Sequence, residues 1–305
     1  MTLSLRITCR ISRIKMRLFV RSILAKFISE STKKKLKKWE FKARQKLVRT
    51  LPELTEDDLR ELLEKQLKIK KGDNLFVHAS LSLLNTKLSS EQVYNIIRDI
   101  VGENGSISVP CFPRMSSKQF MCSNKKFDVK FTPSGMGEFS EYVRKRKDAI
   151  RSFHPTKSIA SVGLSAEVLS GHHECDYPFG KGSPYHKLLE LNPKVIGIGV
   201  PMSYLSFVHI AEDMNPESYP LQVNESKKIT KMCVNEYGED VFVESFVHDM
   251  NVVVKANPEK YVRNNLNSDC WVLTRWYLSP FFIVDGAKLT KQIEVDFKNG
   301  ITVYK

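Results

Sequence analysis

The chain has 305 residues, of which 42% are hydrophobic and 27% are charged, as in soluble globular proteins with a full core. Its formal net charge of +14 lies in residues 1–50, which hold sixteen Lys and Arg against two acidic side chains, whereas residues 51–305 hold 32 of each sign. No run approaches about 18 uninterrupted apolar residues, which excludes a membrane-spanning helix. We expect a basic N-terminal arm over 1–50 and a single domain over 51–305.

Residues 5–27 of the arm predict a basic amphipathic helix, because apolar residues recur at helical spacing with Arg10, Arg13 and Arg17 between them. A second basic run follows over 33–46. Each basic side chain contributes roughly 1 kcal/mol near an anionic bilayer, so the arm could hold the chain at a membrane surface. A solvated arm, a helix packed on a partner subunit and an organelle-targeting peptide reaching Ile28 stay open as alternatives.

The six cysteines are scattered along the chain without a CxxC pair. In a chain of this length without a cleavable apolar leader, this pattern indicates reduced thiols rather than a disulfide framework. We therefore expect a cytoplasmic protein, with peripheral contact at the inner face of the membrane as one role for the arm.

Strands and helices alternate in the first part of the domain. LTEDDLRELLEKQL predicts a helix capped by Thr55, and GDNLFVHASLSLL predicts a turn and a strand that ends at His78. SSEQVYNIIRDIV predicts a capped helix with Ser90 three residues before Val93, and NGSISVPCF predicts a strand stopped by Pro110. This order predicts an α/β fold, with a central mostly parallel or mixed sheet flanked by helices and functional loops at the strand carboxyl ends.

The remaining elements follow in order. Residues 115–133 predict a long irregular loop, and SGMGEFSEYVRKRKDA predicts a helix. KKITKMCVNEYGEDVFVESFV predicts a hairpin around Tyr237-Gly238. The segment from Trp271 predicts further strands joined by a Gly turn at Asp285-Gly286.

A polar block over 151–212 carries the candidate chemistry. Three short apolar runs, SIASVG, VIGIGV and SYLSFV, deliver His154, Ser183, His209 and Glu212, with Gly and Pro turns between them. Enzymes of the α/β class build their active sites from such loops. The block therefore indicates an active site rather than core alone.

His209 and Glu212 lie three residues apart, on one face of a helix that is expected to begin near Ser206. An imidazole held by a carboxylate is suited to removing a proton from an amine or hydroxyl as a general base. A helix-terminal histidine beside a surface glutamate is the alternative. A zinc site would need a second histidine, as in H-x-x-E-H, but position 213 is Asp, so we expect no metal.

Three further polar residues of the block have open roles. His154 precedes Pro155, which favours extended backbone, and a structural histidine is as well supported here as a ligand-binding one. Ser183 follows FGKG, whose glycines let backbone amides approach an anion or a carbonyl, but G-x-S-x-G is absent. Asp176 could orient a histidine or bind a cationic substrate. The chain lacks the dinucleotide and P-loop glycine patterns.

Taken together, six segments resemble, in order, those of the aminoglycoside 3-N-acetyltransferase family. They are GDNLFVHASLSLL, NGSISVPCF, TPSGMGEF, RSFHPTKSIASVG, DYPFGKGSPYHKL and SFVHIAEDM, and the resemblance spans about Gly72 to Tyr219. The resemblance implies an α/β fold distinct from the commoner acetyltransferase superfamily. It also implies an N-acyltransferase that uses acetyl-CoA or another acyl-CoA as cosubstrate, without a metal.

The resemblance also implies roles for individual residues. SFVHIAE resembles the family's T-x-x-H-x-x-E, with His209 as base, Glu212 as its acidic partner, and Ser206 in the Thr position as a donor to the thioester oxygen. In the segment DYPFGKGSP, Asp176 and Ser183 would border the acceptor pocket. The residues that would line the coenzyme A tunnel are His78, Ser80, Leu81, Ser82, Pro110, Phe112, Ser152, His154 and Ser158.

Charge guides the expected acceptor, since aminoglycosides are polycations and this domain is neutral. We favour an anionic acceptor, a nucleotide-linked amino sugar used in surface polysaccharide synthesis. The first alternative is an aminoglycoside 3-N-acetyltransferase that confers antibiotic resistance. The second is a non-catalytic scaffold that binds membrane or nucleic acid, although the aromatic residues of the arm are not spaced for base stacking. The acyl group and the oligomeric state, including a homo-oligomer, stay open.

Overall fold

The computed structural model describes residues 30–169 and 175–304. It divides into two compact units, with the boundary between Thr50 and Leu51. In the first unit, helix α2 (Glu30–Val48) covers the second basic run, whereas the amphipathic helix expected over 5–27 lies outside the described residues. No helix within the described ranges has the length and apolar character needed to cross a bilayer.

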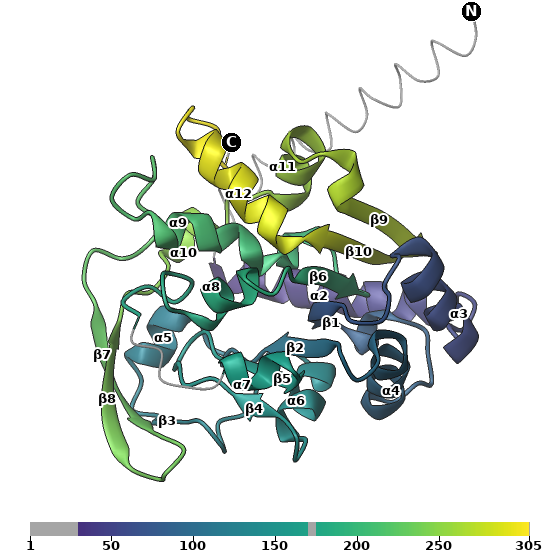
Figure 1. Ribbon diagram of the computed structural model, residues 1–305, viewed down its shortest axis with the longest axis horizontal. Helices are drawn as coiled ribbons and strands as arrows, with labels where there is room; N and C mark the ends of the chain where they lie inside the picture. The colour runs from purple at the N-terminus through teal and green to yellow at the C-terminus, as the bar shows by residue number, and fades with distance from the viewer. Residues whose placement is uncertain (1–29, 170–174, 305) are drawn as a thin grey trace, which may run out of the picture. The chain divides into compact units, whose positions relative to one another are not determined.

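A mixed seven-stranded sheet organises the second unit, which confirms the predicted fold class (Figure 1). Its order is β4-β5-β2-β1-β6-β10-β9. The strands are β1 (Asn74–Ala79), β2 (Ser106–Pro110), β4 (Ile150–Arg151), β5 (Ile159–Gly163), β6 (Lys194–Ile198), β9 (Trp271–Trp276) and β10 (Ser279–Asp285). The three central strands β2, β1 and β6 run parallel, and the flanking pairs are antiparallel.

Helices cover both faces of this sheet, because successive residues of β1 point to opposite sides. Leu75 and Val77 pack with the core beneath α3, α4 and α6, whereas Phe76 packs with the core beneath α8, α9, α11 and α12. The helices are α3 (Glu56–Glu61), α4 (Ser90–Val101), α6 (Glu138–Lys145), α7 (Ser165–Leu169), α8 (Pro184–Leu189), α9 (Ile210–Met214), α10 (Met250–Val253), α11 (Pro258–Asn265) and α12 (Gly286–Phe297). The short helical turns are η1 (Leu62–Gln66), η2 (Leu81–Leu83), η3 (Met202–Tyr204), η4 (Ser206–His209) and η5 (Ser268–Cys270).

Two predicted helix starts have different outcomes. Thr55 caps α3 in a reciprocal box with Asp58, which confirms that prediction. Helix α4 is capped by Ser89, with Gln92 completing the box, so Ser90 is the first helical residue and not the cap. Ser89 and Ser90 have the same side chain, so only the backbone geometry determines which of them is the N-cap.

The prediction of a Gly turn between strands at Asp285-Gly286 is wrong. Asp285 ends β10 and accepts a hydrogen bond from the Lys288 amide, so it caps helix α12. Leu289, Ile293 and Phe297 recur every four residues and are buried, a helical period that the local Gly signal obscured.

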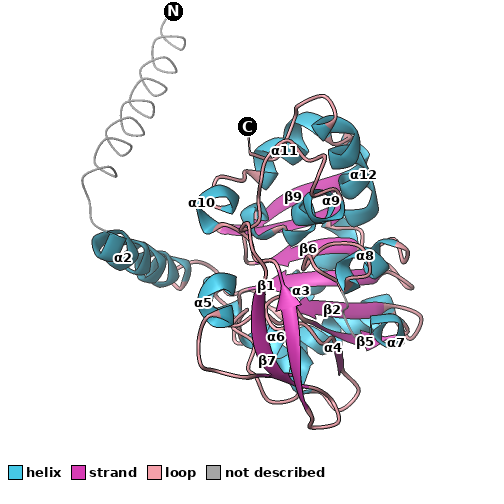
Figure 2. Cartoon of the chain, turned by 90° about the vertical axis from the view of Figure 1, so that its left-hand side faces the viewer, coloured by secondary structure: helices cyan, strands magenta, loops and turns pink. Residues whose placement is uncertain are grey.

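A second, three-stranded sheet stands at one end of the large one (Figures 1 and 2). Strands β7 (Ile229–Val234) and β8 (Asp240–Ser245) form the predicted hairpin, and β3 (Phe127–Asp128) pairs with β7. The predicted loop over 115–133 therefore contains β3 and helix α5 (Ser117–Met121). Phe120 and Phe127 bury a small core against β7, a long-range contact that the local pattern does not reveal.

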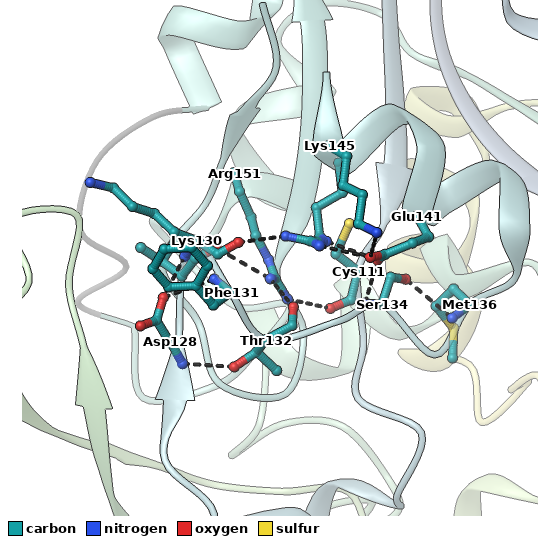
Figure 3. A network of polar contacts seen from close by, with 12 residues as sticks. Cys111, Asp128, Lys130, Phe131, Thr132, Ser134, Met136, Glu141, Lys145 and Arg151 are labelled. Atoms are coloured by element: carbon teal, nitrogen blue, oxygen red, sulfur yellow. Dashed lines mark hydrogen bonds and ion pairs between the residues drawn. The ribbon is translucent and has the colours of Figure 1, made fainter. Parts of the chain in front are cut away.

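A polar network ties the segment from Val129 to Met136 to the large sheet (Figure 3). The Arg151 guanidinium donates to the carbonyls of Val129, Thr132 and Cys111, at 3.2, 2.5 and 3.0 Å. Arg144 donates twice to the Glu141 carboxylate, at 2.8 and 2.7 Å. An Arg fork matches a carboxylate, so this pair within α6 fixes the guanidinium, which also donates to the Lys130 carbonyl at 2.6 Å and so ties the preceding segment to the helix.

Glu141 also accepts a hydrogen bond from the Ser134 amide at 2.8 Å. Burial opposes ionisation of this carboxyl, but the donors from Arg144 and Ser134 outweigh it and lower its pKa to about 2. A carboxylate with a lowered folded-state pKa stabilises the fold above its ordinary pKa of 4.5, and that stability is lost as the pH falls toward 2.

We predict that Glu141→Gln lowers the free energy of unfolding by about 1–2 kcal/mol at pH 7, and that the deficit narrows below about pH 4. Urea denaturation of both proteins at pH 7 and pH 3 measures this difference. Glu91→Gln is the matched control, because Glu91 is an exposed carboxylate of α4. An equal deficit at both pH values would show that the Glu141 charge does not stabilise the fold.

Candidate active site

The site begins where the parallel strands β1 and β6 end side by side. His78 on β1 pairs in register with Gly197 on β6, where any added Cβ would collide with the Phe282 ring. After β6 the chain passes through η3 and η4 into α9, which brings Ser206 back to β1. Ser206 Oγ lies 3.2 Å from His78 Nε2. Burial lowers the pKa of His78 to about 3, so its imidazole is neutral at neutral pH.

His209 and Glu212 form the central contact of the site. His209 Nδ1 lies 2.6 Å from Glu212 Oε1, as expected for residues three apart at the junction of η4 and α9. The Glu212 side chain is fully buried, whereas 18% of the His209 side chain is exposed. Because the carboxylate accepts the Nδ1 proton, Nε2 of His209 is the nitrogen that can take a further proton.

Tyr304 holds the other side of the Glu212 carboxylate. Its hydroxyl lies 2.8 Å from Oε2 and 3.1 Å from Oε1. Burial, followed by the nearby Glu212 charge, raises the pKa of Tyr304 well above its ordinary value, so the hydroxyl stays protonated and donates. Local sequence reasoning missed Tyr304, since no motif links it to residue 212.

Behind this pair lie Asp213 and His248. Asp213 accepts hydrogen bonds from Asn224 Nδ2 at 2.8 Å and from the Phe179 amide at 3.0 Å. Burial alone would raise its pKa, but the adjacent His248 and these donors lower it. His248 Nε2 lies 3.5 Å from Asp213 Oδ1 and 3.8 Å from Glu212 Oε1. The ring of His248 stacks on Phe179, with centroids 5.5 Å apart.

His248 follows β8, and its backbone pairs with Asn224 in an isolated bridge. The centroids of its ring and the His209 ring are 4.7 Å apart. The fold therefore brings a second histidine, His248, beside His209 and Glu212. Its distance from them in the sequence gave no indication of this contact. His209, Glu212 and His248 gather atoms that could ligate a metal ion.

The side chains of the predicted tunnel residues on the 152–158 segment form hydrogen bonds with backbone groups of the protein. His154 is buried, and its Nδ1 accepts hydrogen bonds from the amides of Thr156 and Lys157, at 3.2 and 3.0 Å. Burial lowers the pKa of His154 to about 3, so the ring is neutral. Ser152 Oγ accepts from the Ile159 amide, and Ser158 Oγ donates to the Cys111 carbonyl. These contacts shape the turn between β4 and β5.

The other predicted site residues lie on different elements of the fold. Ser80 and Ser82 lie with their hydroxyls 3.2 Å apart, Leu81 begins η2, and Pro110 ends β2. The Lys157 Nζ atom lies 4.3 Å from the centroid of the Phe112 ring and also faces the Phe179 ring. Ser183 is buried and caps α8, accepting from the His186 amide, whereas exposed Asp176 pairs with Lys228 at 2.6 Å.

A cavity of about 800 Å³ lies apart from the His209 cluster. It opens between the starts of α4 and α6, and Arg114, Ser134, Gly137 and Lys145 are among the residues that line it. None of the predicted site residues borders this cavity. The chemistry of the site therefore rests on the side-chain contacts around His209.

We predict that Tyr304→Phe lowers the free energy of unfolding by about 1.5–3 kcal/mol, because a fully buried carboxylate loses a donor. Chemical denaturation at neutral pH measures the change. Tyr237→Phe, at a tyrosine that is 76% exposed, is the control and should change stability little. Equal stability of the Tyr304→Phe variant and the unmodified chain would mean that Glu212 does not depend on this hydroxyl.

Comparison with known proteins identifies the family of this chain and relatives that share its fold. The family model for aminoglycoside 3-N-acetyltransferase matches residues 76–266. Aminoglycoside N(3)-acetyltransferase VII of Streptomyces paromomycinus is 28% identical over 156 residues, which cover 46% of this chain and 54% of that relative. Aminoglycoside N(3)-acetyltransferase III of Acinetobacter baumannii is 29% identical over 162 residues, which cover 48% and 57%. The chain thus spans about half the length of the curated relatives it matches.

The solved structure of AAC-IIIb in a binary complex with CoASH has a similar fold. The TM-score is 0.67 at 22% sequence identity, and the alignment covers 82% of this chain and 98% of that one. The resemblance stated from the sequence motifs is confirmed, since the family model covers more than half of the residues. The chain belongs to the aminoglycoside 3-N-acetyltransferase family.

Proposed function

We propose that this protein is an N-acetyltransferase that moves the acetyl group of acetyl-CoA to an amine of an aminoglycoside-class amino sugar. The contact between His209 Nδ1 and Glu212 Oε1 carries the proposal, because it provides a partly accessible base that a buried carboxylate orients. The names of the curated relatives support the reaction and the acceptor class. The structure of AAC-IIIb with CoASH supports coenzyme A as the acyl carrier.

The base acts on the acceptor amine. A sugar amine is mostly protonated at neutral pH and attacks only after it loses a proton. Nε2 of His209 takes a proton as the amine nitrogen bonds to the thioester carbon. The C–S bond then breaks, and the proton passes from Nε2 to the leaving sulfur, so coenzyme A departs as the thiol and the base is restored. Such general-base help is worth roughly a factor of a hundred to ten thousand. Holding both substrates together contributes about 7–11 kcal/mol, the larger share.

In this mechanism Ser206 stabilises the oxyanion that forms on the thioester oxygen. In the arrangement that frees the Ser206 hydroxyl to donate, neutral His78 donates from Nε2 to Ser206 Oγ across their 3.2 Å contact. The low pKa of His78 keeps the ring neutral, so it adds no charge that would repel a cationic acceptor. His78 therefore acts here as a positioning residue.

A second acceptor class is a nucleotide-linked amino sugar, the substrate favoured by charge alone. Residues 51–305 are neutral overall, and the Lys157 ammonium faces the Phe112 and Phe179 rings close to His209. Burial lowers the pKa of Lys157 to about 8, which leaves it mostly charged at pH 7. A cation there suits an anionic acceptor. The names of the curated relatives favour aminoglycosides, which we therefore place first.

Coenzyme A release measured against aminoglycosides and nucleotide-linked amino sugars decides between the two acceptors. We expect the larger kcat/KM for an aminoglycoside. A larger value for the nucleotide-linked amines would reverse the order of the two candidates. Turnover of neither class would remove the proposed acceptors.

We predict that His209→Ala lowers kcat at least about a hundredfold, because the base is lost while the binding surfaces remain. Isothermal titration with acetyl-CoA should give an affinity close to that of the unmodified chain. His186→Ala is the control, since His186 lies on α8 outside the cluster. Near-normal turnover of His209→Ala would remove His209 as the base.

The role of residues 1–50 stays a separate proposal. Helix α2 exposes Lys35, Lys38, Lys42 and Lys46, which recur every three or four residues and so share one side. We predict that the full chain sediments with vesicles rich in phosphatidylserine, and that about 0.5 M salt releases it through screening. Failure to sediment at low salt would exclude the membrane role.

A further inference from the structure

We propose that His209, Glu212 and His248 form a binding site for a divalent transition-metal ion such as Zn²⁺, and that the bound ion inhibits the enzyme. One ligand atom from each residue lies within 4.8 Å of the other two. Two imidazoles and one carboxylate are a donor set that zinc commonly takes, with bonds of about 2.0–2.2 Å. The three atoms can therefore close on one ion through small side-chain movements.

The third ligand is provided by the fold and not by a local motif. His248 Nε2 is buried and has no hydrogen-bond partner among the described residues. It points between two carboxylates, 3.8 Å from Glu212 Oε1 and 3.5 Å from Asp213 Oδ1. A buried ring nitrogen left without a hydrogen bond is uncommon, and a metal ion between this nitrogen and Glu212 would satisfy it.

Neighbouring contacts hold these ligands in place. Tyr304 donates to Glu212, and the stacked Phe179 ring fixes the plane of His248. Outer contacts of this kind orient metal ligands and strengthen binding. The exposed part of His209 gives an ion access from solvent, and water would complete a four-coordinate site. Imidazole ligands favour Zn²⁺, Cu²⁺, Ni²⁺ and Co²⁺ over Mg²⁺ or Ca²⁺.

Metal binding would disable the base by moving one proton. Neutral His209 carries its single ring proton on Nδ1, where Glu212 accepts it, and its lone pair on Nε2. An ion bonded to Nδ1 takes that position, so the proton moves to Nε2 through water and the ring stays neutral. Nε2 can then no longer accept a proton from an amine. This inhibitory consequence rests on the proposed function, whereas metal binding itself does not.

Cobalt absorption tests the binding directly. The full chain with His172→Ala and His173→Ala serves as the background, because two histidines adjacent in sequence could bind metal by themselves. Titration with Co²⁺ should produce a visible band typical of a four-coordinate site, and Zn²⁺ should abolish it. His248→Ala and Glu212→Gln in this background should each weaken binding at least about tenfold, whereas His186→Ala should not. Glu212→Gln keeps the side-chain size and so tests the site if His248→Ala fails to fold.

Absence of a band, or equal affinity in the Glu212→Gln variant, would overturn the metal site. The inhibition is measured in a separate assay. Acetyl transfer should be lost when Zn²⁺ is added and should recover when a chelator removes the ion. Cobalt binding without inhibition by Zn²⁺ would overturn the inhibitory role alone. A chain that transfers no acetyl group but still gives the band would refute the proposed function and leave the metal site standing.

Discussion

The site depends on one short contact, 2.6 Å between Nδ1 of the His209 imidazole and Oε1 of the buried Glu212 carboxylate. A buried charge is costly unless donors satisfy it, and Glu212 has two, the His209 ring and the Tyr304 hydroxyl. The same contact sets the tautomer of His209, because the proton held on Nδ1 leaves Nε2 as the accepting nitrogen. The same pair of side chains thus stabilises the buried charge and prepares His209 to act as a base.

The sheet explains why this pair lies beside the Ser206 hydroxyl and the His78 ring. Strands β1 and β6 run parallel and in register, so their carboxyl ends meet at one edge of the sheet. Gly197 lets the Phe282 ring pack against β6, and the chain then turns through η3 and η4 into α9. His78 and Ser206 are 128 residues apart in sequence yet form a side-chain contact.

Local signals predicted the parts of the fold that local physics determines. The Thr55 cap, the hairpin at Tyr237-Gly238 and the spacing of His209 and Glu212 each depend on residues within one turn or loop. Helix α12 was missed because a Gly after Asp can open a turn or a helix. His248 and Tyr304 could not be found, since each reaches Glu212 only through the tertiary fold.

The tautomer of His209 can be measured directly. Two-dimensional proton–nitrogen NMR of the chain labelled at histidine distinguishes the two ring nitrogens, and a His209→Gln spectrum assigns the signals. We predict a neutral ring protonated at Nδ1, with that proton shifted far downfield by its short bond to Glu212 and with Nε2 unprotonated. A ring protonated at Nε2, with Nδ1 bare, would contradict it.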